Sequence, residues 1–239
     1  MKTPFLPLMT ALLLAIGWPQ SVLADGTQTA AAVRDDAPKA PGDILFEVRR
    51  NGEPVGEHQV WFHGSGDDLR VDVRFQISIP ILLIARYDYL YESTSRWQDG
   101  AMTSLTATTD DDGDVSTVTA TYGEGKTQII GPAGEVVGDG SLYPTNHWNT
   151  AVLGSNRVLN TITGEIDDVV ISEIDRETVQ TEQGAITATR YAYSGDLRTE
   201  VLYDADGRWV GMTFEAEDGS TIDYRCLRCQ NGPVVTAVQ

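Results

Sequence analysis

Basic residues, histidines and cysteines are all scarce in this sequence of 239 residues. Lys and Arg number 17 against 35 Asp and Glu, which gives a formal charge of −18 at pH 7. Binding to phosphate backbones or anionic lipid headgroups normally depends on clustered Lys and Arg. The charge therefore argues against nucleic acid as a partner and is typical of a soluble protein.

No apolar run is long enough to span a membrane. The longest, Leu6–Trp18, falls short of the roughly 20 residues that a membrane-spanning helix needs. It follows Lys2 and precedes a small residue, Ala24, with Val22 two positions earlier. This order is typical of a secretory signal peptide, so we expect residues 1–24 to be cleaved after Ala24.

The composition then changes twice along the chain. Residues 25–42 are small and polar, with proline and almost no large apolar side chain, and are expected to form a flexible linker. Residues 43–229 are long enough for one substantial core, and residues 230–239 form a short C-terminal tail.

The clearest periodic signal has a period of two. From Leu69 to Ile79 every odd position is apolar and every even position is polar. Successive side chains of a strand point to opposite faces, so this pattern predicts a strand with one dry face and one wet face. Pro80 cannot donate a ladder hydrogen bond and is expected to kink or end it.

Convincing helical stripes are absent, whereas turn signatures recur at fairly even intervals. They include Asn51-Gly52, Asp112-Gly113 and Asp206-Gly207, which tolerate the positive φ values of tight hairpins. The sequence predicts an all-β fold: a single curved antiparallel sheet or open barrel of about a dozen strands. One short helix is expected near residues 145–153, capped by Thr145 or Asn146.

Two aromatic clusters are candidates for ligand binding. Tyr87, Tyr89 and Tyr91 share one face of a predicted strand, and Tyr143, His147 and Trp148 lie where the strand rhythm is broken. The tyrosines form either the wall of a ligand groove or an aromatic ladder in the core. His147 titrates near neutrality and suits acid-base chemistry, but a histidine beside Trp148 is more often a packing residue.

The two cysteines, Cys226 and Cys229, are three positions apart. An exported chain normally oxidises such a pair, and we predict a disulfide rather than a redox or metal centre. Residues three apart in an extended strand are about 10 Å apart, and a disulfide tolerates less than about 7 Å between Cα atoms. The disulfide therefore requires a turn at Leu227-Arg228.

Recognised catalytic and metal-binding patterns are not found. There is no G-x-S-x-G, and His58 and His63 are an odd number apart, so they lie on opposite faces of one strand. The acidic run at 109–114 lacks the spacing of a calcium loop and fits a hairpin turn. The sequence predicts no catalytic residues, no metal site and no cofactor.

Three segments carry a resemblance: "RWQDGAMTSLTATTDDDG" (96–113), "LYPTNHWN" (142–149) and "YDADGRWVGMTFEAEDGSTIDY" (203–224). They resemble an uncharacterised family of exported proteobacterial β proteins, a domain of unknown function. The succession of hairpins after a signal peptide is also similar to periplasmic half-barrels that carry lipoproteins or lipids. The resemblance implies an envelope location in a Gram-negative cell and brings no catalytic residues.

These observations favour a non-enzymatic periplasmic protein that binds a lipid, another amphipathic molecule or an envelope protein on the concave face of its sheet. Two alternatives stay open. One is a hydrolase-like enzyme in which His147 works with carboxylates from neighbouring strands. The other is a purely structural envelope protein.

Overall fold

A computed structural model describes residues 43–65, 68–81 and 85–233 of the chain. The predicted signal peptide (1–24) and linker (25–42) lie outside these residues, as does most of the predicted tail (230–239). Within the described ranges, no helix has the length and apolarity needed to cross a membrane.

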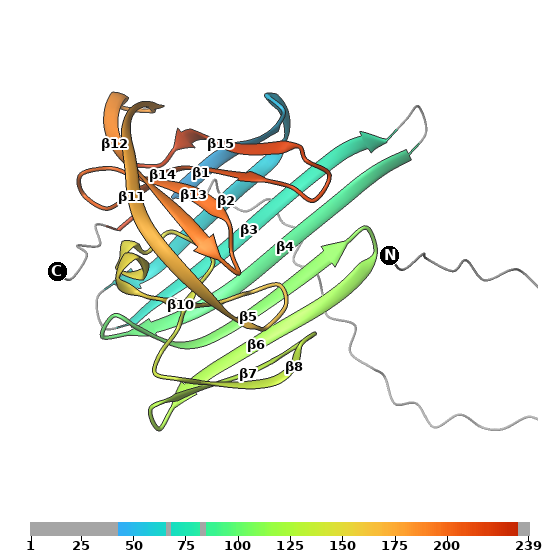
Figure 1. Ribbon diagram of the computed structural model, residues 1–239, viewed down its shortest axis with the longest axis vertical. Helices are drawn as coiled ribbons and strands as arrows, with labels where there is room; N and C mark the ends of the chain where they lie inside the picture. Colours follow the sequence, from blue (N-terminus) through green and yellow to red (C-terminus); the bar gives the residue numbers. More distant parts are fainter. Residues whose placement is uncertain (1–42, 66–67, 82–84, 234–239) are drawn as a thin grey trace, which may run out of the picture. The chain divides into compact units, whose positions relative to one another are not determined.

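The first eight strands follow one another as antiparallel neighbours (Figure 1). They are β1 (Ile44–Arg50), β2 (Glu53–Ser65), β3 (Asp68–Ile81), β4 (Ala85–Gln98), β5 (Ala101–Asp111), β6 (Asp114–Gly123), β7 (Lys126–Gly131) and β8 (Gly134–Asp139).

Seven further strands and one 3₁₀ helix complete the described part of the chain. They are β9 (Tyr143–Pro144), η1 (Thr150–Gly154), β10 (Arg157–Leu159), β11 (Ile166–Thr181), β12 (Gly184–Gly195), β13 (Thr199–Tyr203), β14 (Trp209–Glu215) and β15 (Thr221–Arg228).

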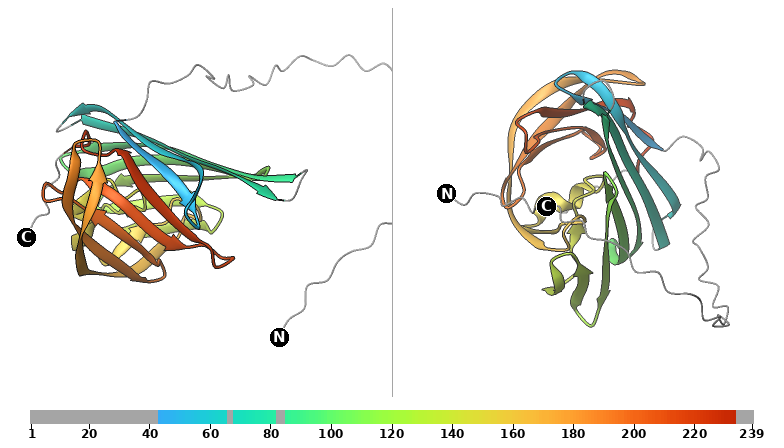
Figure 2. Two further views of the ribbon diagram at one scale, coloured as in Figure 1. Left: turned by 90° about the horizontal axis from the view of Figure 1, so that it is seen from above. Right: turned by 90° about the vertical axis from the view of Figure 1, so that its right-hand side faces the viewer.

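All fifteen strands belong to one sheet whose edges are β8 and β9. These edge strands are consecutive in the chain, separated by residues 140–142 alone, so a connection of about 14 Å at most joins the two edges. The sheet must therefore curl back on itself. The Ala133 amide in the β7–β8 turn donates to the Thr163 carbonyl, 2.9 Å away, near the opposite edge. Because β8 and β9 do not pair, the result is an open barrel (Figure 2).

The predicted fold class is confirmed, with fifteen strands in place of about a dozen. The alternating stretch from Leu69 to Ile79 lies within β3, and its odd residues face the interior. Pro80 falls near the end of β3, one residue before its last, Ile81. The single parallel pair among the described strands joins β9 to β10.

The predicted turn chemistry is also observed. Asn51 and Gly52 both have positive φ values, 52° and 85°, in the β1–β2 hairpin. Asp112 and Gly113 form the β5–β6 hairpin in the same way, with φ values of 51° and 97°. The Asp110 carboxylate accepts a hydrogen bond from the Gly113 amide at 2.9 Å, so this acidic run closes a hairpin.

The helix predicted near residues 145–153 is the short 3₁₀ helix η1, but its predicted cap was wrong. Asn149, rather than Thr145 or Asn146, precedes η1, and its side chain accepts a hydrogen bond from the Ala151 amide at 3.0 Å. Asn146 serves elsewhere, because its amide group is buried against β4.

The segment from β9 to β10 fills one end of the barrel. The Trp148 ring packs edge-on against Phe62 of β2 and Trp97 of β4, with ring centroids 5.3 and 5.0 Å away. On the opposite side, the Tyr203 hydroxyl of β13 donates to the His147 carbonyl at 2.8 Å. We call residues 141–162 the plug segment and the region around Trp97 and Trp148 the filled end. The plug segment thus joins strands from both halves of the sheet.

Candidate functional site

The other end of the interior contains a cavity of about 910 Å³. This volume is within the ~300–1,000 Å³ range usual for small-molecule sites. Strands β3, β4, β14 and β15 form most of its wall, with one residue each from β1, β2 and β5, and residues of the plug segment form its inner boundary. Most of the wall is apolar, with contributions from Phe75, Ile77, Ile79, Met212, Phe214 and Ile222.

The three tyrosines of β4 lie along this cavity. Tyr87 and Tyr89 are partly buried, and Tyr91 is 5% exposed. Burial raises the pKa of Tyr89 to about 12 and raises the pKa of Tyr91 as well, so both phenols stay protonated at neutral pH. The tyrosines therefore present aromatic faces and neutral hydroxyl groups, as an amphipathic ligand requires.

Tyr91 also connects the cavity wall to the plug segment. Its hydroxyl donates to the Asn146 side-chain oxygen at 3.0 Å, and the Asn146 amide nitrogen donates to the Ser93 hydroxyl at 3.3 Å. All three side chains are buried. Their hydrogen bonds hold the plug segment at a fixed distance from β4 and so define the depth of the cavity.

His147 lines the cavity from the plug segment and is 8% exposed. Its ring lies edge-on to Tyr193, with centroids 5.5 Å apart, and near Trp209. Burial lowers its pKa to about 4, so the ring is neutral at pH 7. Its φ of 59° is a left-handed conformation, uncommon for a residue with a side chain. The surrounding contacts stabilise a backbone turn that places the ring at the inner boundary of the cavity.

The structure does not supply the carboxylate partner that catalysis by His147 would need. Among the residues that it describes, no ion pair joins the His147 ring to an Asp or Glu side chain. The hydrolase hypothesis therefore gains no support from the geometry around this ring.

A second histidine on the cavity, His58 of β2, was not among the predicted site residues. It lies two positions from Val60 and hence on the same inward face, a signal that the period-two pattern already contained. His63, an odd number of positions away, is exposed and lies 3.1 Å from an Asp72 carboxylate oxygen. The prediction that the two histidines face opposite sides is confirmed.

Charged residues at the cavity are almost all acidic. Arg50 is the one basic residue on it among the described residues, and it forms an ion pair with Asp218. The remaining carboxylates are Asp111, Glu215 and Glu217, all exposed. The rim of the cavity therefore carries an excess of negative charge.

Tyr143 and Trp148, also predicted as ligand-binding residues, lie at the filled end. Trp148 is 3% exposed, and Tyr143 is half-buried against Trp97 with ring centroids 6.1 Å apart. Neither belongs to the cavity wall that the structure describes. The structure thus brings four of the six predicted residues to one cavity: Tyr87, Tyr89, Tyr91 and His147.

Cys226 and Cys229 form the predicted disulfide. Their Cα atoms are 5.7 Å apart, yet both lie in or next to β15 without a turn at Leu227-Arg228. Phe46 of β1 pairs with Cys226 and the preceding Leu45 pairs with Arg228, so Leu227 is an extra residue in the ladder. A β-bulge, which the sequence did not reveal, shortens the strand enough for the bond.

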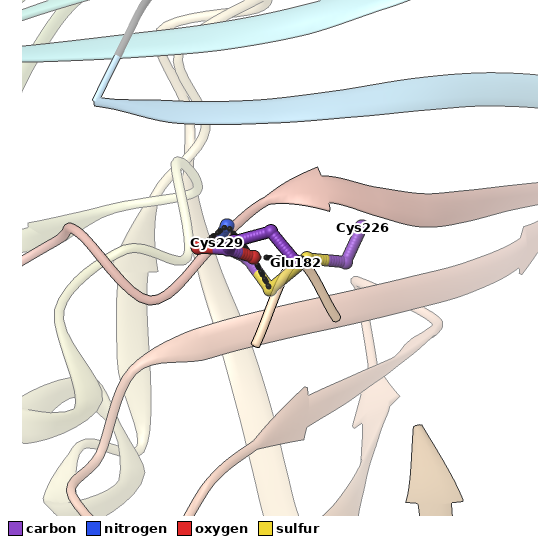
Figure 3. A group of neighbouring side chains, drawn as sticks. All are labelled: Glu182, Cys226 and Cys229. Carbon is purple, nitrogen blue, oxygen red and sulfur yellow. Dashed lines mark hydrogen bonds between the residues drawn. A yellow bond between two sulfur atoms is a disulfide. The ribbon is translucent and has the colours of Figure 1, made fainter. Parts of the chain in front are cut away.

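The carboxylate of Glu182, in the β11–β12 turn, secures the chain after the disulfide (Figure 3). It accepts hydrogen bonds from the amides of Cys229 and Gln230 at 3.0 Å each. The sulfur atoms and this carboxylate lie within 4.8 Å of one another, but in the disulfide both sulfurs are bonded together and neither is a thiolate ligand.

The fold defines a class of antiparallel, barrel-like β proteins. A crystal structure described as a beta-barrel-like protein of domain of unknown function DUF1849 from Brucella abortus superposes with a TM-score of 0.57 at 12% identity. The match covers 78% of this chain and 95% of that one and shows a shared fold.

Within this class, the chain belongs to the domain of unknown function family DUF6134, whose model matches residues 46–227. The predicted membership of an uncharacterised β family is confirmed. None of the curated proteins matches the sequence.

Proposed function

We propose that this protein is a non-enzymatic binder of an amphipathic small molecule in the bacterial periplasm. The observation that carries the proposal is the cavity of about 910 Å³, because an apolar wall with a few convergent polar groups is the usual form of a ligand site. Its lining by Tyr87, Tyr89 and Tyr91 supports the same conclusion.

The periplasmic part of the proposal is supported by the predicted signal peptide and by the disulfide, which persists in oxidising compartments. Expression in a Gram-negative host, followed by osmotic shock and intact-mass measurement, tests it. The expected product is released with the periplasm, begins at Asp25 and is oxidised. A cytoplasmic product that retains residues 1–24 would contradict it.

Binding is tested with N-phenyl-1-naphthylamine, an uncharged aromatic probe whose fluorescence rises in apolar surroundings. The wild type is expected to bind it, and Ile79→Trp is expected to weaken binding at least about tenfold by filling the cavity. Ile130→Trp is the matched control, since Ile130 is 62% exposed on β7 and away from the cavity. A wild type that binds no probe would favour the purely structural alternative.

A further inference from the structure

His58 is a buried polar side chain without a hydrogen-bond partner. The residue is 7% exposed, and among the residues that the structure describes neither Nδ1 nor Nε2 has a partner. Leaving a buried polar group unpaired destabilises the folded protein, and nearly all such groups in native proteins are paired. The ring therefore lacks a partner that its position calls for.

The surroundings of His58 are aromatic on three sides. Phe75, Trp209 and Tyr224 have ring centroids 5.7, 5.0 and 5.5 Å from that of His58. The ring also lines the cavity, and because neighbouring side chains cover both of its nitrogens, a ligand reaches them when one of the adjacent rings moves aside. We infer that His58 is a ligand-binding residue, whose imidazole exchanges a hydrogen bond with a hydroxyl or carbonyl group of the amphiphile in the cavity.

The charge state of the ring narrows the class of ligand. Burial, together with the nearby His147, lowers the pKa of His58 to about 3, so at pH 7 the ring is neutral with one donor and one acceptor. A neutral ring offers no ionic attraction to a carboxylate. It satisfies an uncharged hydroxyl or carbonyl group equally well as acceptor or donor.

The charges at the rim of the cavity also favour an uncharged ligand. Asp111, Glu215 and Glu217 repel an anionic headgroup, and the positive charge of Arg50 is already paired with Asp218. The ligand class is therefore an uncharged amphiphile such as an alcohol, ester or amide. This inference rests on the proposed binding function, and the experiment below separates the two.

The experiment measures displacement of N-phenyl-1-naphthylamine by 1-decanol and by decanoate at pH 7. The wild type is expected to bind 1-decanol at least about tenfold more tightly than decanoate. The decanoate charge is either buried in the apolar cavity, where it loses its hydration, or held at the rim, where the carboxylates repel it. Equal binding of the two, or tighter binding of decanoate, would overturn the proposed ligand class.

Variants then assign the preference to His58. His58→Leu is expected to weaken 1-decanol binding about fivefold more than it weakens probe binding, and His58→Gln, which keeps a donor and an acceptor, should restore most of the 1-decanol affinity. His63→Leu is the matched control on the outer face of β2 and should behave as the wild type. Unchanged 1-decanol affinity in His58→Leu would refute the role of His58 but leave the binding function intact, whereas a folded wild type that binds neither compound would refute the binding function itself.

A measurement on the wild type covers the case in which His58→Leu does not fold. The ring-nitrogen NMR signals of His58 are expected to shift on addition of 1-decanol, while those of exposed His63 stay in place. Saturating 1-decanol without a shift at His58 would overturn the inference.

Discussion

Strands β3 and β4 build two different halves of the same interior. Toward the filled end, Val71, Val73 and Trp97 are at most 2% exposed. Toward the β3–β4 hairpin, the inward residues Ile77, Ile79 and Tyr87 follow the same alternation but are only partly buried. The difference lies in the plug segment, which packs on Trp97 through Trp148 and borders the cavity with Asn146 and His147. Alternation decides which way a side chain points, and the plug segment decides whether it is packed or left facing a cavity.

The sharpest test of this comparison is Trp148→Ala. Removing a large ring that packs on Phe62 and Trp97 is expected to lower the free energy of unfolding by about 3–5 kcal/mol. Urea denaturation followed by tryptophan fluorescence and circular dichroism measures it. A loss below about 1 kcal/mol would mean that the plug segment does not hold the filled end together.

Lowering the pH is expected to destabilise the fold through His58 and His147, the two buried histidines that face the cavity. Their folded-state pKa values of about 3 and about 4 lie below the ordinary 6.5, so below pH 6.5 the unfolded chain binds protons that the folded chain does not. Stability should therefore fall as the pH falls from 6.5 toward 4, by up to about 1.4 kcal/mol per pH unit for each histidine. Urea midpoints between pH 7 and 5 measure the slope.

His58→Leu supplies the control for this pH dependence, because it should remove about half of the slope. Asp167 and Asp223 have the opposite effect near pH 4. Burial raises their pKa values, so as the pH falls the folded state binds protons before the unfolded state does, and this stabilises the fold. A slope that is the same in His58→Leu would show that other groups are responsible.

The disulfide fixes the end of β15 beside the filled end. The Cys226→Ser/Cys229→Ser variant is expected to lose about 2 kcal/mol of unfolding free energy, a modest amount because only three positions separate the cysteines. Probe binding in the cavity should stay unchanged, since neither cysteine lines it. Loss of probe binding in the folded variant would mean that the two ends are coupled.

The smallest effect is expected at the cavity wall. Ile79→Ala should cost less than about 1 kcal/mol, because its side chain is partly exposed and its removal enlarges an existing space. Val71→Ala in the same strand, where the side chain is fully buried, should cost about 2 kcal/mol despite removing fewer atoms. The reverse order would contradict the difference between the two halves.

Local features of this fold were readable from the sequence because each depends on a few neighbouring residues. Strand geometry explains the alternation from Leu69 to Ile79. The freedom of Asn and Gly to adopt positive φ explains the Asn51-Gly52 turn, and the oxidation of paired cysteines explains the disulfide. The plug segment was visible as an interruption of the alternating strand pattern. The partners of the plug segment were not visible, because they come from distant strands: Phe62 of β2, for example, lies 86 residues before Trp148.

The cavity was predictable only in part. Tyr87, Tyr89 and Tyr91 were identified from their shared face, and all three line it. Where the plug segment ends is a property of three-dimensional packing, so the sequence did not separate these residues from Tyr143 and Trp148. His58 was missed because a single histidine between apolar positions carries no sign of whether it has a partner.

The pairing of the first strand with the last sets the order in which the sheet can be completed. Phe46 and Val48 of β1 pair with Cys226 and Tyr224 of β15. Since synthesis proceeds from the amino terminus, hairpins β1 to β8 can form one after another, while the outer edge of β1 stays without its neighbour until residues 221–228 exist. Free strand edges recruit other chains. While residues 51–220 are being made, this protein must therefore be kept from aggregating through β1.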